Sequence, residues 1–316
     1  MTRIILDCDP GHDDAIALML ALASPEVELL GVTTVYGNHS LRRTTENAIR
    51  VLDHLGRDDV PVAAGAQRPL VRGRHHAGHV HGETGLDGAD LPPPSRPAER
   101  DHAIDWIAGK TSSQPQSVTL VATGPLTNVA LALARYPELE QRLGRIVLMG
   151  GAIAEGNVTP AAESNIWADP EAARRVFSSG LDLTMVGLDV TYKAQLTDVH
   201  AQRLAATGSP GMLLADLHAF YARHHRRRTG GGAAPVHDAV AVAHVIDPSL
   251  LEVKRCGVRV DTGAELSRGR TYVDRWGSAG WEANCHVAVD IDAERFLELL
   301  IERIGGLGRP SVGSPT

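Results

Sequence analysis

The sequence predicts an α/β fold, with one doubly wound, mostly parallel sheet and helices on both faces. Short apolar runs alternate with stretches of helix length between residues 3 and 190, and no linker or change in composition divides the chain. Strands joined by single helices of this length must run parallel, with right-handed crossovers that cover both faces. With 316 residues and 43% hydrophobic content, the chain can bury the core of one large domain.

The first part of the chain reads as strand, helix, strand, helix, strand. Apolar runs such as "RIILDC" and "VPVAAG" are typical of buried strands, and helix-length segments separate them. The same alternation continues after a long interruption. We expect strands at residues 3–8, 28–37, 60–65, 117–123, 145–150 and 181–190, and helices at residues 13–23, 44–55, 128–135 and 170–179.

Other segments depart from this rhythm. Residues 72–100 carry turn-forming residues, prolines and four histidines without periodicity, which predicts a long loop near a site. The end of the chain, "GGLGRPSVGSPT", has no apolar pattern. We therefore expect one domain over residues 1–304 and a flexible tail over residues 305–316. The second half should also contain helices at residues 212–226 and 236–246 and late strands at residues 258–260, 270–273 and 285–289.

Composition limits the partners and the compartment. A formal net charge of −7 and a pI near 6.1 argue against non-specific nucleic-acid binding, which needs a basic face. No segment reaches eighteen uncharged apolar residues, and the N-terminus lacks the apolar core of a signal peptide. Cys8, Cys256 and Cys285 are odd in number and lack CxxC spacing. We expect a soluble cytoplasmic protein with reduced thiols that acts on small molecules and binds no membrane.

The segment "DCDPGHDD" places four carboxylates, Asp7, Asp9, Asp13 and Asp14, at the end of the first strand. Ligands of parallel sheets bind at this edge. Capping of the next helix explains one or two of these carboxylates, because the helix dipole favours negative charge at its start. Four such groups raise one another's pKa unless a cation intervenes. An oxygen-rich cluster suits calcium or magnesium, and calcium accepts more ligands and looser geometry.

Polar residues also follow the other apolar runs. Each alone has a plain explanation, since Asn38 and Thr123 can close turns, and His237 with Asp238 can cap a helix. Their recurrence at the same edge of one predicted sheet favours a common site. The candidates are Asn38, Thr123, Asn157, Glu163, Asn165, His237 and Asp238.

Five motifs occur in one order: "DCDPGHDD", "TTVYGN", "TGPLTN", "EGNVTPAAESN" followed by "DPEAA", and "VHDAVAVAHVIDP". In this order the chain resembles the inosine–uridine-preferring nucleoside hydrolase family over roughly residues 3 to 250. The resemblance implies hydrolysis of the N-glycosidic bond of a ribonucleoside to ribose and free base. It also implies one Ca²⁺ per subunit and a homodimer or homotetramer.

The resemblance assigns roles to the candidate residues. The implied calcium ligands are Asp9, Asp14, Asp238 and the carbonyl of Thr123, and Asp9 is the implied general base on a calcium-bound water. Asp7 is expected to support the site without binding. The implied ribose-binding residues are Asp13, Asn38, Asn157, Glu163 and Asn165.

The resemblance also implies which residues lie near the nucleobase. His81 and His237 match catalytic positions that face the nucleobase, where a histidine with a pKa near neutral can donate a proton or a hydrogen bond to the departing ring. Tyr221 and His225 match positions over the base. Having both histidines resembles the family members that accept pyrimidine nucleosides or a broad range including inosine. His225 and Ser164 stand where aromatic residues are common, and they leave the base preference open.

Two alternative functions share the same motif. A haloacid dehalogenase-like phosphohydrolase would use Asp7 as nucleophile, Asp9 as acid–base and magnesium, but it predicts Thr or Val two residues after Asp9, where this chain has Gly11. A non-catalytic, calcium-dependent nucleoside-binding protein would keep the ligands without turnover. The presence of both Asp9 and His237 favours catalysis.

Three further features have plainer explanations. The histidines at 75, 76, 79 and 81 could form a transition-metal tract, but a loop over the active site explains them without a second metal. The run "RHHRRR" fits a solvated helix end better than a phosphate-binding patch in a chain of negative net charge. The thiol of Cys8 should have a raised pKa between two aspartates and be a poor nucleophile.

Overall fold

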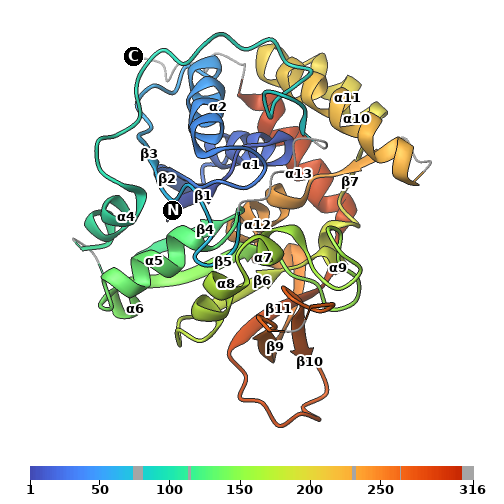
Figure 1. Ribbon diagram of the computed structural model, residues 1–316. Coiled ribbons are helices and arrows are strands. Elements are labelled where there is room, and N and C mark those ends of the chain that lie inside the picture. The colour runs from blue at the N-terminus through green and yellow to red at the C-terminus, as the bar shows by residue number, and fades with distance from the viewer. Residues whose placement is uncertain (74–80, 113–114, 230–232, 264, 308–316) are drawn as a thin grey trace.

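The computed structural model describes residues 1–73, 81–112, 115–229, 233–263 and 265–307. Its main sheet has nine strands in the order β3-β2-β1-β4-β5-β6-β11-β9-β10 (Figure 1). Neighbours from β3 to β11 run parallel, whereas β9 runs antiparallel to both β11 and β10. The strands are β1 (Thr2–Cys8), β2 (Val27–Thr34), β3 (Val62–Ala64), β4 (Val118–Ala122), β5 (Leu143–Met149), β6 (Leu183–Val186), β9 (Leu251–Val260), β10 (Thr271–Asp274) and β11 (Cys285–Ile291), and β7 (Gln195–Thr197) pairs with β8 (Ala233–Pro235) in a separate sheet.

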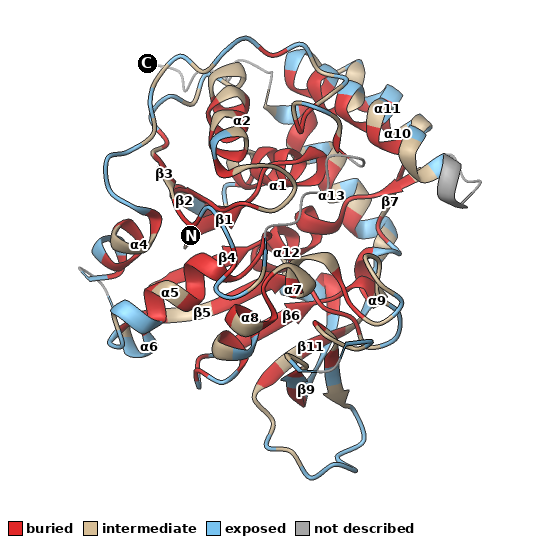
Figure 2. Ribbon diagram, viewed as in Figure 1, coloured by how far each residue is buried: buried red, intermediate tan, exposed pale blue. Residues whose placement is uncertain are grey.

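Helices cover both faces of the sheet because successive strand residues point to opposite sides. In β1, Ile4 and Leu6 pack into one core, and Ile5 packs into the other. The central strands are accordingly buried along most of their length (Figure 2). The first core is covered by α1 (His12–Ala23), α2 (Leu41–His54), α11 (Ser209–Thr229), α12 (His237–Ile246) and α13 (Ala293–Gly306), and the second by α4 (Ala103–Ser112), α5 (Thr127–Arg135) and α8 (Pro170–Phe177).

The predicted fold class is confirmed, and most predicted elements lie within one to three residues of their observed bounds. The prediction for residues 181–190 is wrong in its second half. The strand β6 ends at Val186, and the chain then turns into the short helix α9 (Leu188–Thr191). The Leu188 amide donates to the Gly151 carbonyl oxygen at 2.9 Å, and Gly187 allows this approach because a Cβ atom there would also lie 2.9 Å from that oxygen.

Several elements were not predicted. The helix α4, the amphipathic helix α13 and the helix α10 (Asp198–Ala205) lay in segments for which no element was expected. Shorter unpredicted elements are α6 (Leu139–Arg142), α7 (Ser164–Ala168), the 3-10 turn η1 (Pro248–Leu250) and the strands β7 and β8. The strand expected at residues 258–260 begins earlier, at Leu251.

The long loop and the tail are described only in part. Residues 82–100 contain neither a helix nor a strand, as predicted. The helix α13 reaches Gly306, so the first two residues of the predicted tail are helical, and residues 308–316 lie outside the described residues. No helix of the described chain combines the length and apolar character needed to cross a bilayer.

The strand order determines where a ligand can bind. The chain builds outward from β1 to β3 and then returns to the other side of β1 with β4. Loops after β1 and β4 therefore diverge at the edge where the strands end, and such a switch point is the usual ligand site of an open parallel sheet. Asp9 follows β1, and Thr123 follows β4.

Candidate active site

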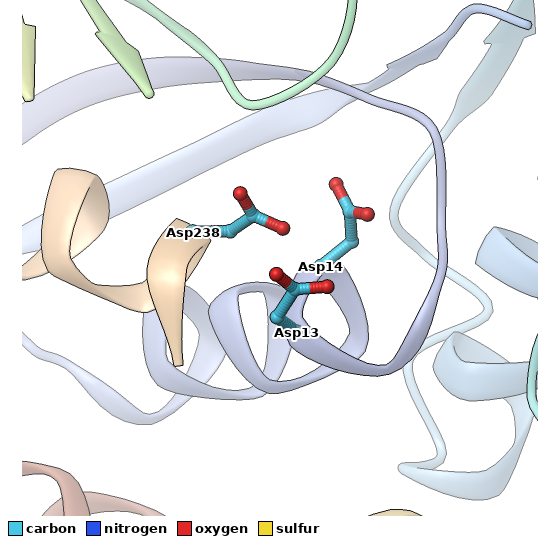
Figure 3. A group of neighbouring side chains, drawn as sticks. All are labelled: Asp13, Asp14 and Asp238. Atoms are coloured by element: carbon cyan, nitrogen blue, oxygen red, sulfur yellow. The ribbon is translucent and has the colours of Figure 1, made fainter. Parts of the chain in front are cut away.

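Three carboxylates from two helices meet at this switch point. Asp13 and Asp14 lie in the first turn of α1, and Asp238 lies in the first turn of α12. One oxygen from each of the three lies within 4.8 Å of the other two, and the side chains point toward one another (Figure 3). All three are buried. Asp14 and Asp238 were predicted as metal ligands, whereas the third member of this group is Asp13, which the resemblance assigned to ribose.

Asp9 lies beside this group in a cradle of glycines. A Cβ atom at Gly37 would lie 2.0 Å from Asp9 Oδ2, and one at Gly124 would lie 2.6 Å from Asp9 Oδ1. The backbone amide of Asn38 donates to Asp9 Oδ2 at 2.5 Å, and the Asn38 side chain donates to Asp14 Oδ2 at 3.1 Å. The motifs after β1, β2 and β4 thus converge on one carboxylate, as their common position at strand ends predicts.

The donor set fits a divalent cation. Among the described residues, Asp9 Oδ1 and Asp13 Oδ1 are buried and have no hydrogen-bond partner. Burial and the neighbouring Asp14 raise the pKa of Asp13 to about 7, and the same two causes raise the pKa of Asp9 well above its ordinary value. Burial, followed by Asp13 and Asp14, does the same for Asp238. Ionised carboxylates packed so closely require a positive charge, and an all-oxygen set suits calcium or magnesium.

Thr123 contacts the cluster through its side chain as well as its backbone. Its hydroxyl donates to Asp14 Oδ1 at 2.8 Å, and its carbonyl oxygen accepts from Asn165 Nδ2 at 2.7 Å. Because a carbonyl oxygen has two lone pairs, this hydrogen bond leaves capacity for the metal contact that the resemblance implies.

The segment after β5 lies against the same site. Asp9, Asn38, Ser164 and Asn165 line one narrow cleft. Asn157 Oδ1 accepts from the amide of Ser164 at 2.9 Å, which closes the loop before α7.

The carboxylate of Glu163 is already bound by backbone amides, unlike a group that is free to bind ribose. Its carboxylate accepts from the backbone amides of Gly151, Asn165 and Ile166 and caps α7, while burial raises its pKa. Its first role in this structure is therefore to position Asn165.

A cluster of rings forms the other side of the site. Tyr221, in α11, stacks on His81 with ring centroids 5.6 Å apart, and its ring meets His225 edge to face at 4.7 Å. Both residues were predicted from the resemblance to lie over the base. His12 and Phe220 belong to the same stack and were not singled out in the sequence. His75, His76 and His79 lie outside the described residues.

His237 is in hydrogen-bonding contact with Thr191, a residue that the sequence did not point to. Its Nδ1 lies 2.7 Å from the hydroxyl of Thr191, at the end of α9, and the ring of Tyr192 packs edge-on at 5.2 Å. Burial, with the nearby His225, lowers the pKa of His237 to about 3. This pKa lies below the near-neutral range in which a histidine donates a proton, and it favours an uncharged imidazole at neutral pH. A hollow of about 530 Å³ opens beside Tyr192, His225 and Asp189.

Asp7 and Cys8 are enclosed by the sheet. Asp7 is fully buried in β1, where Thr33 Oγ1 donates to its Oδ1 at 2.6 Å and Asn128 Nδ2 donates at 2.8 Å. Both of these hydrogen bonds to Asp7 come from groups inside the fold, Thr33 of β2 and Asn128 of α5, and this placement disfavours the phosphohydrolase alternative, in which Asp7 attacks. The Cys8 thiol is also buried, and burial followed by the charges of Asp14, Asp7 and Asp9 raises its pKa, as predicted.

Comparison with known proteins finds similar nucleoside hydrolases over nearly the whole chain. A family model described as inosine-uridine preferring nucleoside hydrolase matches residues 4–298. Pyrimidine-specific ribonucleoside hydrolase RihA of Shewanella sp. (strain ANA-3) is 48% identical over 303 residues, which cover 95% of each chain. A plant nucleoside hydrolase structure, PpNRh1, has a TM-score of 0.92 at 34% identity and covers 96% of this chain and 99% of its own. A purine-preferring ribonucleoside hydrolase from Gardnerella vaginalis has a TM-score of 0.92 at 36% identity, over 97% and 99%.

Proposed function

Because this chain belongs to the inosine–uridine preferring nucleoside hydrolase family, we propose that it is a calcium-dependent ribonucleoside hydrolase that prefers pyrimidine nucleosides. The observation that carries this proposal is the buried group of Asp13, Asp14 and Asp238, with the unpartnered Asp9 Oδ1 beside it and histidines on its other side. Hydrolysis breaks the bond between C1′ and the base nitrogen, forms a bond from C1′ to a water oxygen, and moves one proton from water and one to the base.

The ion would be held by Asp14, Asp238, the Thr123 carbonyl and Asp9 or Asp13. When bound, Ca²⁺ supplies positive charge that keeps these carboxylates ionised, lowers the pKa of a coordinated water and aligns ribose hydroxyls. Asp9 takes the proton of the attacking water, and its pocket between Gly37 and Gly124 limits where its oxygens can lie. The remaining anionic charge favours the positive charge that develops on the ribosyl ring.

Ribose would be bound by the amide and carboxylate groups at the strand ends. Asn38 and Asn165 are themselves held by hydrogen bonds to Asp9 and to the Thr123 carbonyl, so both are oriented before substrate arrives. Asn157 and Glu163 position the loop that carries Asn165, and either can also accept from a ribose hydroxyl. Asp13 is shared between the ion and the sugar in this proposal.

His81, His237, Tyr221 and His225 would face the base. His237 is uncharged at neutral pH, so its contribution is a hydrogen bond to the departing ring. The pyrimidine preference is supported by the name of the 48% identical relative and by this pair of histidines. We further propose a homodimer or homotetramer in the cytoplasm, which size-exclusion chromatography with light scattering and cell fractionation would test.

The direct test measures free base and ribose from uridine, cytidine, inosine and adenosine. We expect kcat/KM for uridine and cytidine to exceed that for inosine, chelation to abolish turnover, and calcium to restore it better than magnesium. Release of phosphate from a phosphomonoester, lost in Asp7→Asn, would instead support the phosphohydrolase. Tight, calcium-dependent nucleoside binding without base release would support a non-catalytic protein.

A further inference from the structure

His12 is a fully buried imidazole inside the turn that carries the carboxylates. Its Nε2 lies 2.8 Å from the backbone carbonyl oxygen of Asp87, and its Nδ1 lies 3.0 Å from Nδ1 of His81. A carbonyl oxygen can only accept, so Nε2 of His12 must carry a hydrogen. The second nitrogen of the same ring is thereby directed at His81.

Polar and stacking contacts with this turn surround the His81 ring. Besides the contact between the two Nδ1 atoms, the backbone amide of His12 lies 3.3 Å from His81 Nδ1. The His12 and His81 rings stack at 5.3 Å with an angle of 21° between their planes, and the ring of Tyr221 stacks on both. The fit depends on Gly11, because a Cβ atom there would lie 2.6 Å from His81 Nδ1.

The loop that carries His81 is attached to the same turn by other groups as well. Asn47 Nδ2 donates to the carbonyl oxygens of Pro10 and Thr84 at 3.1 and 2.9 Å. The carboxylate of Asp87 accepts from the backbone amides of Glu83 and Thr84, both at 3.0 Å. The loop therefore has anchors that do not involve His12, and removal of the His12 imidazole changes the ring contacts of His81 first.

We propose that His12 is a positioning residue that holds the imidazole of His81 in one orientation toward the nucleobase. This inference rests on the proposed function, because it needs His81 to act on the base. Because Nε2 of His12 donates to Asp87, the hydrogen between the two Nδ1 atoms belongs to His81. We therefore assign His81 the form with a hydrogen on both nitrogens, which donates from Nε2 to the departing base. A hydrogen-bonded partner that fixes a functional histidine commonly changes activity by about 10- to 100-fold when it is removed.

A purely structural histidine would have different consequences. Filling the space beside Phe220 and Tyr221, with ring centroids at 5.2 and 5.5 Å, would make His12 important for stability alone. His12→Phe keeps an aromatic ring in the stack and removes both ring hydrogen bonds. His12→Asn replaces the ring but keeps a polar atom near the position of Nδ1, whereas His12→Gln keeps one near the position of Nε2.

The test compares two substrates of the purified protein with calcium present. Uridine needs assistance to its departing base, whereas 4-nitrophenyl riboside releases a phenolate that needs no proton. For His12→Phe we expect kcat on uridine to fall by about 10- to 100-fold with KM changed by less than about threefold. On the nitrophenyl substrate the rate should change by less than about threefold, because no nucleobase is present. His12→Asn should recover more of the uridine rate than His12→Gln.

A double variant separates action through His81 from action through the carboxylates. If His12 works through His81, the His12→Phe change should have no further effect in a His81→Phe background. His244→Phe, which replaces another buried histidine in α12 away from this ring stack, serves as the control and should leave both rates unchanged. Equal slowing of both substrates, or an additive double variant, would overturn the positioning role.

A measurement on the unaltered protein keeps the inference testable if the variants fold poorly. In ¹⁵N-histidine-labelled protein we expect one hydrogen on Nε2 of His12 and one hydrogen between the two Nδ1 atoms, seen as coupled imidazole signals. Two Nδ1 atoms with no shared hydrogen would overturn the inference. Wild-type protein that cleaves neither substrate would remove the proposed function, whereas active wild-type protein with unchanged His12→Phe rates would remove only the role of His12.

Discussion

The carboxylate side and the histidine side of the site are built by different physical means. On the carboxylate side, Asp9 and Asp14 are enclosed by backbone amides, by Asn38 and by glycines that a single Cβ atom would disturb. On the histidine side, rings from distant segments pack in pairs: His81 stacks on Tyr221, and His237 meets Tyr192 edge to face. Hydrogen bonds at the strand ends therefore hold the carboxylates, whereas packing between helices and loops holds the rings that we propose to face the base.

The largest expected effect tests the carboxylate side. Asp9→Ala should reduce kcat by several orders of magnitude, because a general base alone contributes about 10²- to 10⁴-fold and Asp9 also faces the cation. The reduction is measured as kcat on uridine with saturating calcium. Asp59→Ala, which removes an exposed aspartate paired with Arg57, is the control and should have no effect. Normal turnover of folded Asp9→Ala would remove Asp9 from the mechanism.

A smaller effect tests whether tight packing holds Asp9. Gly37→Ala places a methyl group 2.0 Å from Asp9 Oδ2, so either the loop or the carboxylate must move. We expect a loss of about 1–3 kcal/mol in the free energy of unfolding and a lower kcat. Denaturant titration and turnover measure both. Gly109→Ala, in α4 with no neighbour within 4 Å, should be neutral or stabilising, since alanine favours helices.

The pH dependence of calcium binding tests the charge on the same side. Raised pKa values, about 7 for Asp13, mean that protons compete with the cation as pH falls. Calcium should therefore raise Tm more at pH 7.5 than at pH 5.5. The corresponding gain in the free energy of unfolding should be larger at pH 7.5 by on the order of 1–3 kcal/mol. The pKa values of the buried His12, His237 and His244 are lowered to about 4, 3 and 4, so these three side chains do not titrate in this pH range. The difference between the two pH values should be smaller in Asp13→Asn, and a shift independent of pH would contradict the role of these carboxylates.

The smallest effect tests the histidine side. Thr191→Val removes the hydroxyl 2.7 Å from His237 Nδ1 and keeps the shape of the side chain. We expect kcat on uridine to fall by about tenfold or less, because the ring of His237 remains packed against Tyr192. Thr191→Ser should restore most of the rate. Equal rates for both variants would mean that the hydroxyl does not orient His237.

The sequence predicted the parts of the site that lie close together along the chain. "DCDPGHDD" predicted a cation site because four carboxylates in eight residues have no other economical explanation, and Asn38 and Thr123 were found because each follows a strand. Thr191 was not found, because residues 181–190 read as one continuous strand and the turn at Gly187 depends on the backbone of Gly151. His12 was overlooked because its partners, His81 and Asp87, are about seventy residues away in sequence.

By itself, the sequence determined the α/β class, the edge of the sheet that carries the site and the acidic chemistry there. Periodicity and motif order are local properties, and parallel strands bring their ends to one edge whatever their order. Only the tertiary structure decided that Asp13 joins Asp14 and Asp238, that Asp7 is sealed inside the sheet, and which partners orient His81 and His237. Those outcomes depend on contacts between α1, α9, α12 and the loop around His81, which no periodicity encodes.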